Sequence, residues 1–273
     1  MDAAQPAARA LLAFWRAAGV DMDEAEAAFA RGLGAPPSSR QRDGRLEAGG
    51  PKAQAARKRA PIAGAPVEDA RALAAAAGSV AALRAAVEGF SGCALKTTAR
   101  TTVFSDGPDS ARILLIGEAP GKDEDEQGRP FVGRSGQLLD RMLATIGLDR
   151  KQNLLISNTI YWRPPGNRPP TQGEIAACLP FVDRLIELVR PDVLILCGGV
   201  AAQIVLRREE GVMRLRGRRL NYAREGKPPV NAMVMLHPAY LLRRPQEKRL
   251  AWADLLLLEA WLDELKLSRA KRP

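Results

Sequence analysis

Four short apolar runs recur along the chain after residue 110, and segments with helical periodicity separate them. The runs are Arg112–Gly117, Leu154–Ile160, Val193–Leu196 and Met233–Leu236. Continuous apolar runs of this length are typical of strands buried on both faces of a parallel sheet. Apolar residues at helical spacing occupy Gly136–Ile146, Thr171–Val189, Ala201–Arg207 and Leu250–Leu267. The alternation predicts an α/β fold with three layers, α/β/α, around a short, parallel, four-stranded sheet.

The N-terminal part of the chain has a different pattern. Residues 1–33 include a helical pattern at residues 4–18, so we expect a helical extension there. Residues 34–66 are rich in Pro, Gly, Ala and Arg, with little that could pack, and are expected to form a flexible basic linker. This linker either adds weak phosphate contacts or is only a solvated tether. The compact domain is expected to span residues 67–273.

Composition adds a strong positive charge to this picture. The chain has 41 Lys and Arg against 31 Asp and Glu, a formal charge of +10. Such a balance favours nucleic acid as a partner, although a solvated basic surface explains it equally well. Three cysteines without a CxxC pair indicate a reducing compartment, and no apolar run approaches the ~18 residues of a membrane span. We therefore expect a cytoplasmic, nucleoid-associated protein that does not bind membranes.

Polar and glycine-rich segments follow all four predicted strands. The first strand runs into GEAPG, the second ends near Asn158, the third ends in CGG and the fourth ends in HPAYLLR. Ligands of open α/β sheets bind beyond the carboxyl ends of the strands. The sequence therefore predicts a ligand site at this edge of the sheet.

Three side chains at this edge suit the recognition of a base. Phe131, in the loop PFVGRSG, is either a core residue or a ring that stacks on an extruded base. Asn158 offers an acceptor and two donors in one plane, which suits a pyrimidine edge, or it caps a neighbouring loop. His237 is the single histidine of the chain, and a lone histidine is more often structural than catalytic. Each residue alone is a weak signal.

Three longer motifs in the sequence resemble those of a known protein family. GEAPGKDEDEQGRPFVGRSGQLL, then an asparagine followed by TIYWRPPGNRPPT, then HPAYLLR, stand in this order. Together they resemble family 4 uracil-DNA glycosylases of the uracil-DNA glycosylase superfamily, over roughly Phe90 to Leu267. The resemblance implies an enzyme that flips uracil out of DNA and hydrolyses its N-glycosidic bond. The product would be an abasic site for base excision repair.

The resemblance also implies roles for the uracil pocket. Phe131 matches the aromatic that stacks on uracil, and Asn158 matches the amide that reads N3 and O4. His237 matches the imidazole that donates to O2. Glu118 stands at the motif position linked to the attacking water or the sugar cation, which makes His237 and Glu118 the expected catalytic residues. Further uracil contacts are expected from Gly117 and, as a secondary candidate, Glu124.

Contacts to the DNA strand are expected from the remaining motif residues. The HPAYLLR segment matches the loop that enters the minor groove, as a wedge and as a phosphate ligand. The expected DNA-binding residues are Leu241, Leu242, Arg243, Arg163 and Asn167. We expect a monomer whose partner is uracil-containing DNA, and a repair or clamp protein could dock through the N-terminal arm.

The sequence departs from the family at the iron–sulfur site. Family 4 enzymes typically carry a [4Fe–4S] cluster on four cysteines, and the matching positions here hold Phe90, Cys93, Trp162 and Cys178. Two thiolates do not hold a cubane in the usual way. We therefore expect no cofactor and no metal, with Cys93 and Cys178 as vestiges and both aromatic residues filling the vacated volume.

Two other functions compete with this interpretation. The first is a binder of damaged DNA that is non-catalytic or retains its product, which predicts the same basic surface. The second is a dinucleotide enzyme, which fits the α/β pattern but lacks GxGxxG after the first strand. Covalent trapping of the product, as in a related group, is excluded because that chemistry takes a second histidine.

Overall fold

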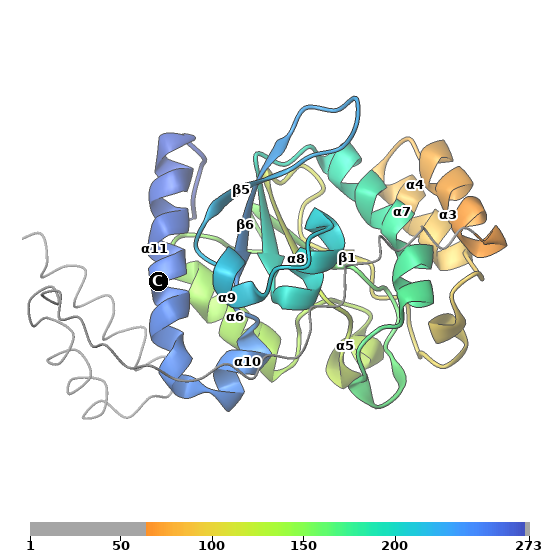
Figure 1. The fold of residues 1–273 in the computed structure, drawn as a ribbon, viewed down its shortest axis with the longest axis horizontal. Helices are drawn as coiled ribbons and strands as arrows, with labels where there is room; N and C mark the ends of the chain where they lie inside the picture. The colour runs from red at the N-terminus through yellow and green to blue at the C-terminus, as the bar shows by residue number, and fades with distance from the viewer. Residues whose placement is uncertain (1–63, 271–273) are drawn as a thin grey trace, which may run out of the picture.

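The computed structural model describes residues 64–270, and they form a sheet with helices on both faces (Figure 1). The expected N-terminal extension, residues 1–33, and the expected linker, residues 34–66, lie outside this range apart from residues 64–66. Helix α3 begins at Ala65, two residues before the expected start of the compact domain.

The four predicted parallel strands form the centre of the sheet. They are β2 (Ile113–Gly117), β3 (Leu154–Asn158), β4 (Val193–Cys197) and β6 (Val230–Met235). The expected number of four strands is corrected to six, in the order β1-β3-β2-β4-β6-β5, because antiparallel strands β1 (Ser105–Asp106) and β5 (Arg219–Tyr222) complete the edges. A two-residue strand and a strand with alternating burial contain no continuous apolar run, so the sequence pattern did not reveal them.

Helices cover both faces of the sheet and connect its strands. The α-helices are α3 (Ala65–Ala76), α4 (Val80–Gly89), α5 (Lys122–Gln127), α6 (Arg134–Ala144), α7 (Gln172–Val189), α8 (Gly199–Leu206), α9 (Val212–Leu215), α10 (Pro238–Arg243) and α11 (Lys248–Glu264). Three 3-10 turns are η1 (Ala94–Thr97), η2 (Pro165–Asn167) and η3 (Pro245–Glu247). No helix of residues 64–270 has the length and apolar character that a membrane crossing requires.

Alternate residues of each strand enter two separate cores. Leu114 and Ile116 of β2 pack with α3, α4, α7 and α8 on one face. Ile113 and Leu115 pack with α6, α10 and α11 on the other. Each such fully buried side chain contributes roughly 1.5–3 kcal/mol of transfer free energy. The three-layer prediction is therefore confirmed, and burial on both faces explains why the strands read as continuous apolar runs.

Candidate active site

The carboxyl ends of β2 and β3 and the residues after β6 meet at one edge of the sheet. Gly117 is the partner of Asn158 in the parallel register of β2 and β3. A Cβ added to Gly117 would lie 2.5 Å from Asn158 Oδ1 and 2.5 Å from Phe131 Cζ. The ring of Phe131 lies 5.6 Å from the ring of His237, centroid to centroid. The structure thus brings together four of the predicted pocket residues.

Phe131 stands in an unusual backbone conformation. Its φ of 54° lies in the left-handed region, which costs of order 1–3 kcal/mol for a residue with a side chain unless the surroundings hold it. The residue is in the loop between α5 and α6, and its ring packs over the end of β2, where Gly117 leaves room. The ring is 6% exposed, so its open surface is small.

Asn158 has a buried oxygen without a partner. The residue is 2% exposed, and its Oδ1 accepts no hydrogen bond. A buried acceptor left unpaired costs about 1–3 kcal/mol. Within residues 64–270, the other buried side-chain atom of this kind is the Tyr161 hydroxyl, which lies in the core. Because Oδ1 lies beside the Phe131 ring, it marks the place where a ligand N–H would pair.

His237 is held as a neutral hydrogen-bond donor. Its Nδ1 accepts a hydrogen bond from the backbone N–H of Ala239 at 3.1 Å, which caps helix α10. Burial, followed by the positive charge of Arg243, lowers the pKa of His237 to about 4. In the neutral imidazole, therefore, the proton resides on Nε2. Gly198, with φ 98°, packs against this side chain, and a Cβ there would lie 3.1 Å from His237 Cβ.

Glu118 follows β2 directly and is half-buried. Burial raises the pKa of its carboxyl above the ordinary value. Its backbone oxygen accepts hydrogen bonds from Thr159 Oγ1 at 2.6 Å and from the N–H of Ile160 at 3.1 Å. These bonds extend the pairing of β2 and β3 past the sheet and fix the start of the loop that carries Glu118.

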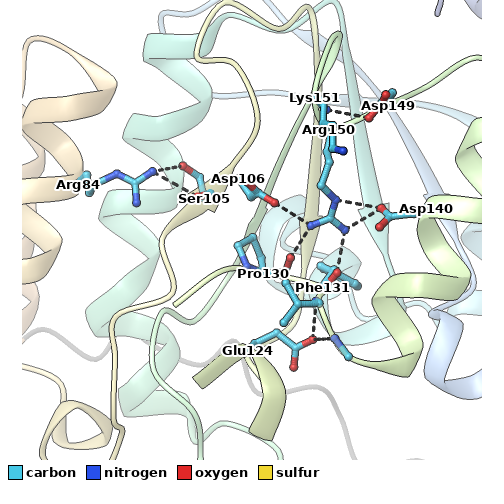
Figure 2. A network of polar contacts seen from close by, with 12 residues as sticks. Arg84, Ser105, Asp106, Glu124, Pro130, Phe131, Asp140, Asp149, Arg150 and Lys151 are labelled. Carbon is cyan, nitrogen blue, oxygen red and sulfur yellow. Dashed lines mark hydrogen bonds and ion pairs between the residues drawn. The ribbon is translucent and has the colours of Figure 1, made fainter. Parts of the chain in front are cut away.

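Both carboxylate oxygens of Glu124 accept hydrogen bonds from the backbone. Its Oε1 accepts hydrogen bonds from the backbone N–H groups of Val132 and Gly133, both at 2.9 Å (Figure 2). Its Oε2 accepts from the N–H of Gly121 at 3.0 Å. With both oxygens engaged by the backbone, the carboxylate holds the loop of Phe131, and a uracil contact from Glu124 stays a prediction.

The HPAYLLR segment is a helix, α10, rather than a loop, with Pro238 at its first position. Leu241 is 0% exposed and packs in the core with α6 and α11, so the prediction that it is a DNA wedge is wrong. Leu242 is 37% exposed and Arg243 is exposed. The packing of α10 thus buries the first of these two leucines and leaves the second exposed.

The two other expected DNA contacts lie together on the loop after β3. Arg163 Nε donates to Asn167 Oδ1 at 2.8 Å, and Asn167 has a left-handed φ of 55°. Asn167 is exposed and Arg163 is half-buried. The loop then enters α7 through a capping box of Thr171 and Glu174. Its direction is thereby fixed at both ends, by β3 and by α7.

Sequence reasoning missed two residues that shape this site. Gly198 directly follows β4, which ends at Cys197, and the glycine pair at positions 198 and 199 was its only signal in the sequence. Arg150 contacts the backbone of Phe131 from the turn before β3, and no motif points to it.

The fold and this group of side chains define a class of proteins. Residues 104–256 match the Uracil DNA glycosylase superfamily, and the chain belongs to that superfamily. The type-4 uracil-DNA glycosylase of Archaeoglobus fulgidus is 40% identical over 158 residues, which cover 56% of this chain and 78% of that protein. The type-4 enzymes of Thermotoga maritima and Pyrobaculum aerophilum are 36% and 35% identical over 152 and 157 residues, or 77% and 79% of their lengths. The resemblance seen in the motifs is confirmed.

The comparisons contradict the prediction of a chain without a cofactor. The matched relatives are type-4 enzymes, a class that carries a [4Fe–4S] cluster, so two substituted positions are not a sufficient ground for that prediction. At the four matching positions, the Cys93 and Cys178 thiols are buried, the neighbouring Cys178 lowers the pKa of Cys93, and the rings of Phe90 and Trp162 lie 6.5 Å apart. Two thiols do not complete a four-thiolate set.

Proposed function

We propose that this protein is a monofunctional uracil-DNA glycosylase that removes uracil from DNA and leaves an abasic site for repair. One observation carries the proposal: a buried, unpartnered Asn158 Oδ1 lies beside the ring of Phe131, which in turn lies 5.6 Å from His237. A stacking surface, an in-plane acceptor and a neutral donor are what a flipped pyrimidine requires. Membership of the superfamily supports the same activity.

Asn158 distinguishes uracil from cytosine by the direction of its hydrogen bonds. Uracil has a donor at N3 and an acceptor at O4, which pair with Oδ1 and Nδ2 of the amide. Cytosine presents an acceptor at N3 and a donor at N4, so both pairs would be repulsive. Because Oδ1 is buried, water cannot relieve the mismatch. The amide does not separate uracil from thymine, whose edge carries the same groups.

The chemistry proposed for the site is a dissociative hydrolysis. The bond between C1′ and N1 breaks, its electron pair stays on uracil, and negative charge develops at O2. The Nε2–H of His237 donates to O2, and a preorganised donor of this kind contributes about 2.7–4 kcal/mol. The carboxylate of Glu118 stabilises the sugar cation and orients the water that adds to C1′. The water proton leaves to solvent, and no amine nucleophile takes part.

The net positive chain supplies the sequence-independent affinity for DNA. We propose that Arg243 contacts a phosphate and that Leu242, exposed beside it on α10, contacts the base stack from which uracil has left. Arg163 and Asn167 lie on the loop after β3 and are proposed as a second contact. Since one chain contains all these residues, we propose that it acts as a monomer.

The direct test is cleavage of an end-labelled duplex that contains one uracil. The protein is expected to generate an alkali-labile site at the uracil, with free uracil in equal amount and no strand break before alkali. The same duplex with cytosine in place of uracil is the control. Retention of the labelled duplex in a mobility shift without release of uracil would indicate a binder instead, and would refute the enzymatic proposal.

Asn158→Asp tests the assignment of the pocket. An acceptor would replace the donor that faces O4, so uracil excision is expected to fall by about 10- to 100-fold. Excision of cytosine, whose N4 is a donor, is expected to rise relative to uracil. The ratio of single-turnover rates on the two duplexes is the measurement. An unchanged ratio in a folded variant would show that Asn158 does not read the base.

A further inference from the structure

The guanidinium of Arg150 holds the two peptide units that flank Phe131. Arg150 lies in the turn between α6 and β3, and its side chain extends to the Phe131 loop (Figure 2). Nη1 donates to the Pro130 carbonyl oxygen and Nη2 to the Phe131 carbonyl oxygen, each at 2.8 Å. One planar group therefore restrains the peptide that sets φ of Phe131 and the peptide that sets its ψ.

Two carboxylates from different elements orient this guanidinium. Asp106 of β1 accepts from Nη1 at 3.0 Å. Asp140 of α6 accepts from Nε at 3.0 Å and from Nη2 at 2.7 Å. The Arg150 side chain is 11% exposed. With each nitrogen engaged and little solvent access, the guanidinium is a rigid clamp, and the planar fork of arginine suits this arrangement.

The peptide between Phe131 and Val132 is also held at its N–H group, on the side opposite the carbonyl oxygen that Arg150 binds. Glu124 Oε1 accepts from the N–H of Val132, which belongs to the peptide whose oxygen Arg150 binds. Helix α6 leaves little room for that oxygen to move, because a Cβ on Gly136 would lie 1.9 Å from it. These contacts explain why a phenylalanine remains at φ 54°, a conformation that residues with a side chain usually leave.

We propose that Arg150 is a positioning residue for uracil recognition, acting through Phe131. The inference rests on the proposed function, since its effect is on the ring that stacks on the flipped base. The direction of a side chain follows from the backbone of its residue, and the clamp fixes that backbone where the ring meets Gly117 and His237. Asp106 and Asp140 act one step further away, by holding Arg150.

The first measurement does not depend on catalysis. In Arg150→Gln, the amide hydrogens of Val132 and Gly133 are expected to exchange faster than in the parent protein, while those of the central strands stay protected. Arg219→Gln is the matched control, because Arg219 also forms a two-nitrogen pair, with Glu264 at 2.6 Å, but does so at an exposed edge of the sheet. Unchanged exchange at the Phe131 loop in Arg150→Gln would overturn the inference, whatever the activity of the protein.

The second measurement tests whether Arg150 acts through the ring. Arg150→Gln is expected to lower the single-turnover rate of uracil excision by about 10²-fold, as misplaced groups do, without changing affinity for undamaged duplex. In a Phe131→Leu background, the same substitution is expected to cost little more. An equal loss in both backgrounds, or a parent rate in folded Arg150→Gln, would contradict the inference. A parent protein that never releases uracil would instead refute the proposed function.

A third variant guards against a folding defect. Arg150→Lys keeps a positive charge between Asp106 and Asp140 but has one nitrogen, so it cannot hold both carbonyl oxygens as the fork does. We expect it to fold and to excise uracil at a rate between those of the parent and Arg150→Gln. A rate equal to the parent's, with parent exchange at Val132, would show that charge alone suffices and would overturn the clamp.

Discussion

Nδ1 of His237 accepts a hydrogen bond from the backbone N–H of Ala239, two residues further along the chain, at 3.1 Å. This bond gives one side chain two tasks, because it caps helix α10 and leaves the ring proton on Nε2. Since burial lowers the pKa of His237 to about 4, the ring is neutral at physiological pH. The side chain is therefore a ready donor to an oxygen that gains charge, without a proton transfer of its own.

His237→Asn separates these two tasks. Asparagine is a good N-cap, so α10 and the thermal midpoint are expected to stay near the parent values, whereas His237→Ala also loses the cap. Both variants lose the donor to O2, and single-turnover excision is expected to fall by about 10²- to 10³-fold. Affinity for undamaged duplex should not change, because O2 gains charge only as the bond breaks. Excision at the parent rate by either variant would place the donor elsewhere.

Gly117→Ala tests the contact between the stacking ring and the amide. The added Cβ would lie 2.5 Å from both Phe131 Cζ and Asn158 Oδ1, so one of them must move. We expect excision to fall by about 10²-fold with the fold retained. Gly173→Ala is the control, since nothing lies within 4 Å of its added Cβ and its rate should match the parent's. Equal rates for the two variants would show that the pocket tolerates the displacement.

The pH dependence of excision separates Glu118 from His237. Burial raises the pKa of Glu118, so its carboxylate is lost at a higher pH than that of a free glutamate. As pH falls, the rate is expected to decline first with Glu118, since only the charged form stabilises the sugar cation. Glu118→Gln should be slow, and its rate should stay flat until pH approaches 4, where His237 is protonated. If Glu118→Gln shows the same decline of rate at low pH as the parent protein, that decline comes from the titration of another group.

Arg243→Ala should weaken binding to all duplexes alike. Arg243 is exposed on α10 and is proposed to contact one phosphate. Its loss is expected to reduce the slope of log affinity against log salt by about 0.9, with the same change for uracil-containing and undamaged DNA. Titrations between about 50 and 200 mM salt measure it. A loss confined to uracil-containing DNA would assign Arg243 to recognition of the lesion.

The two leucines of α10 should behave differently. Leu241→Ala removes a fully buried side chain and is expected to cost about 2–5 kcal/mol of unfolding free energy. Leu242→Ala should leave stability almost unchanged and slow excision from duplex more than from single-stranded DNA, because only a duplex must be opened. Denaturant unfolding and single-turnover rates on both substrates are the measurements. An equal fold loss of rate, relative to the parent protein, on the two substrates would exclude Leu242 as a wedge.

The amino-acid sequence by itself determined the layers and the edge of the site. Each central strand is buried on both faces and therefore appears as a continuous apolar run, and the polar residues that follow it must lie at the carboxyl edge. Asn158 and His237 were visible for this reason, and the order of the motifs revealed the family. Both inferences depend on local patterns, which neighbouring residues along the chain are sufficient to specify.

Tertiary structure alone decided which of the motif residues face the pocket. Leu241 and Leu242 are equivalent in the sequence, and only the packing of α10 on α6 and α11 buries the first and exposes the second. Glu124 stands in the motif like a pocket residue, yet its Oε1 accepts from the backbone of the Phe131 loop and its Oε2 from the N–H of Gly121. Arg150 has no motif, because its partners come from β1, α6 and a distant loop. Contacts between segments far apart in the chain leave no periodic signal in the sequence, so these roles depend on the fold.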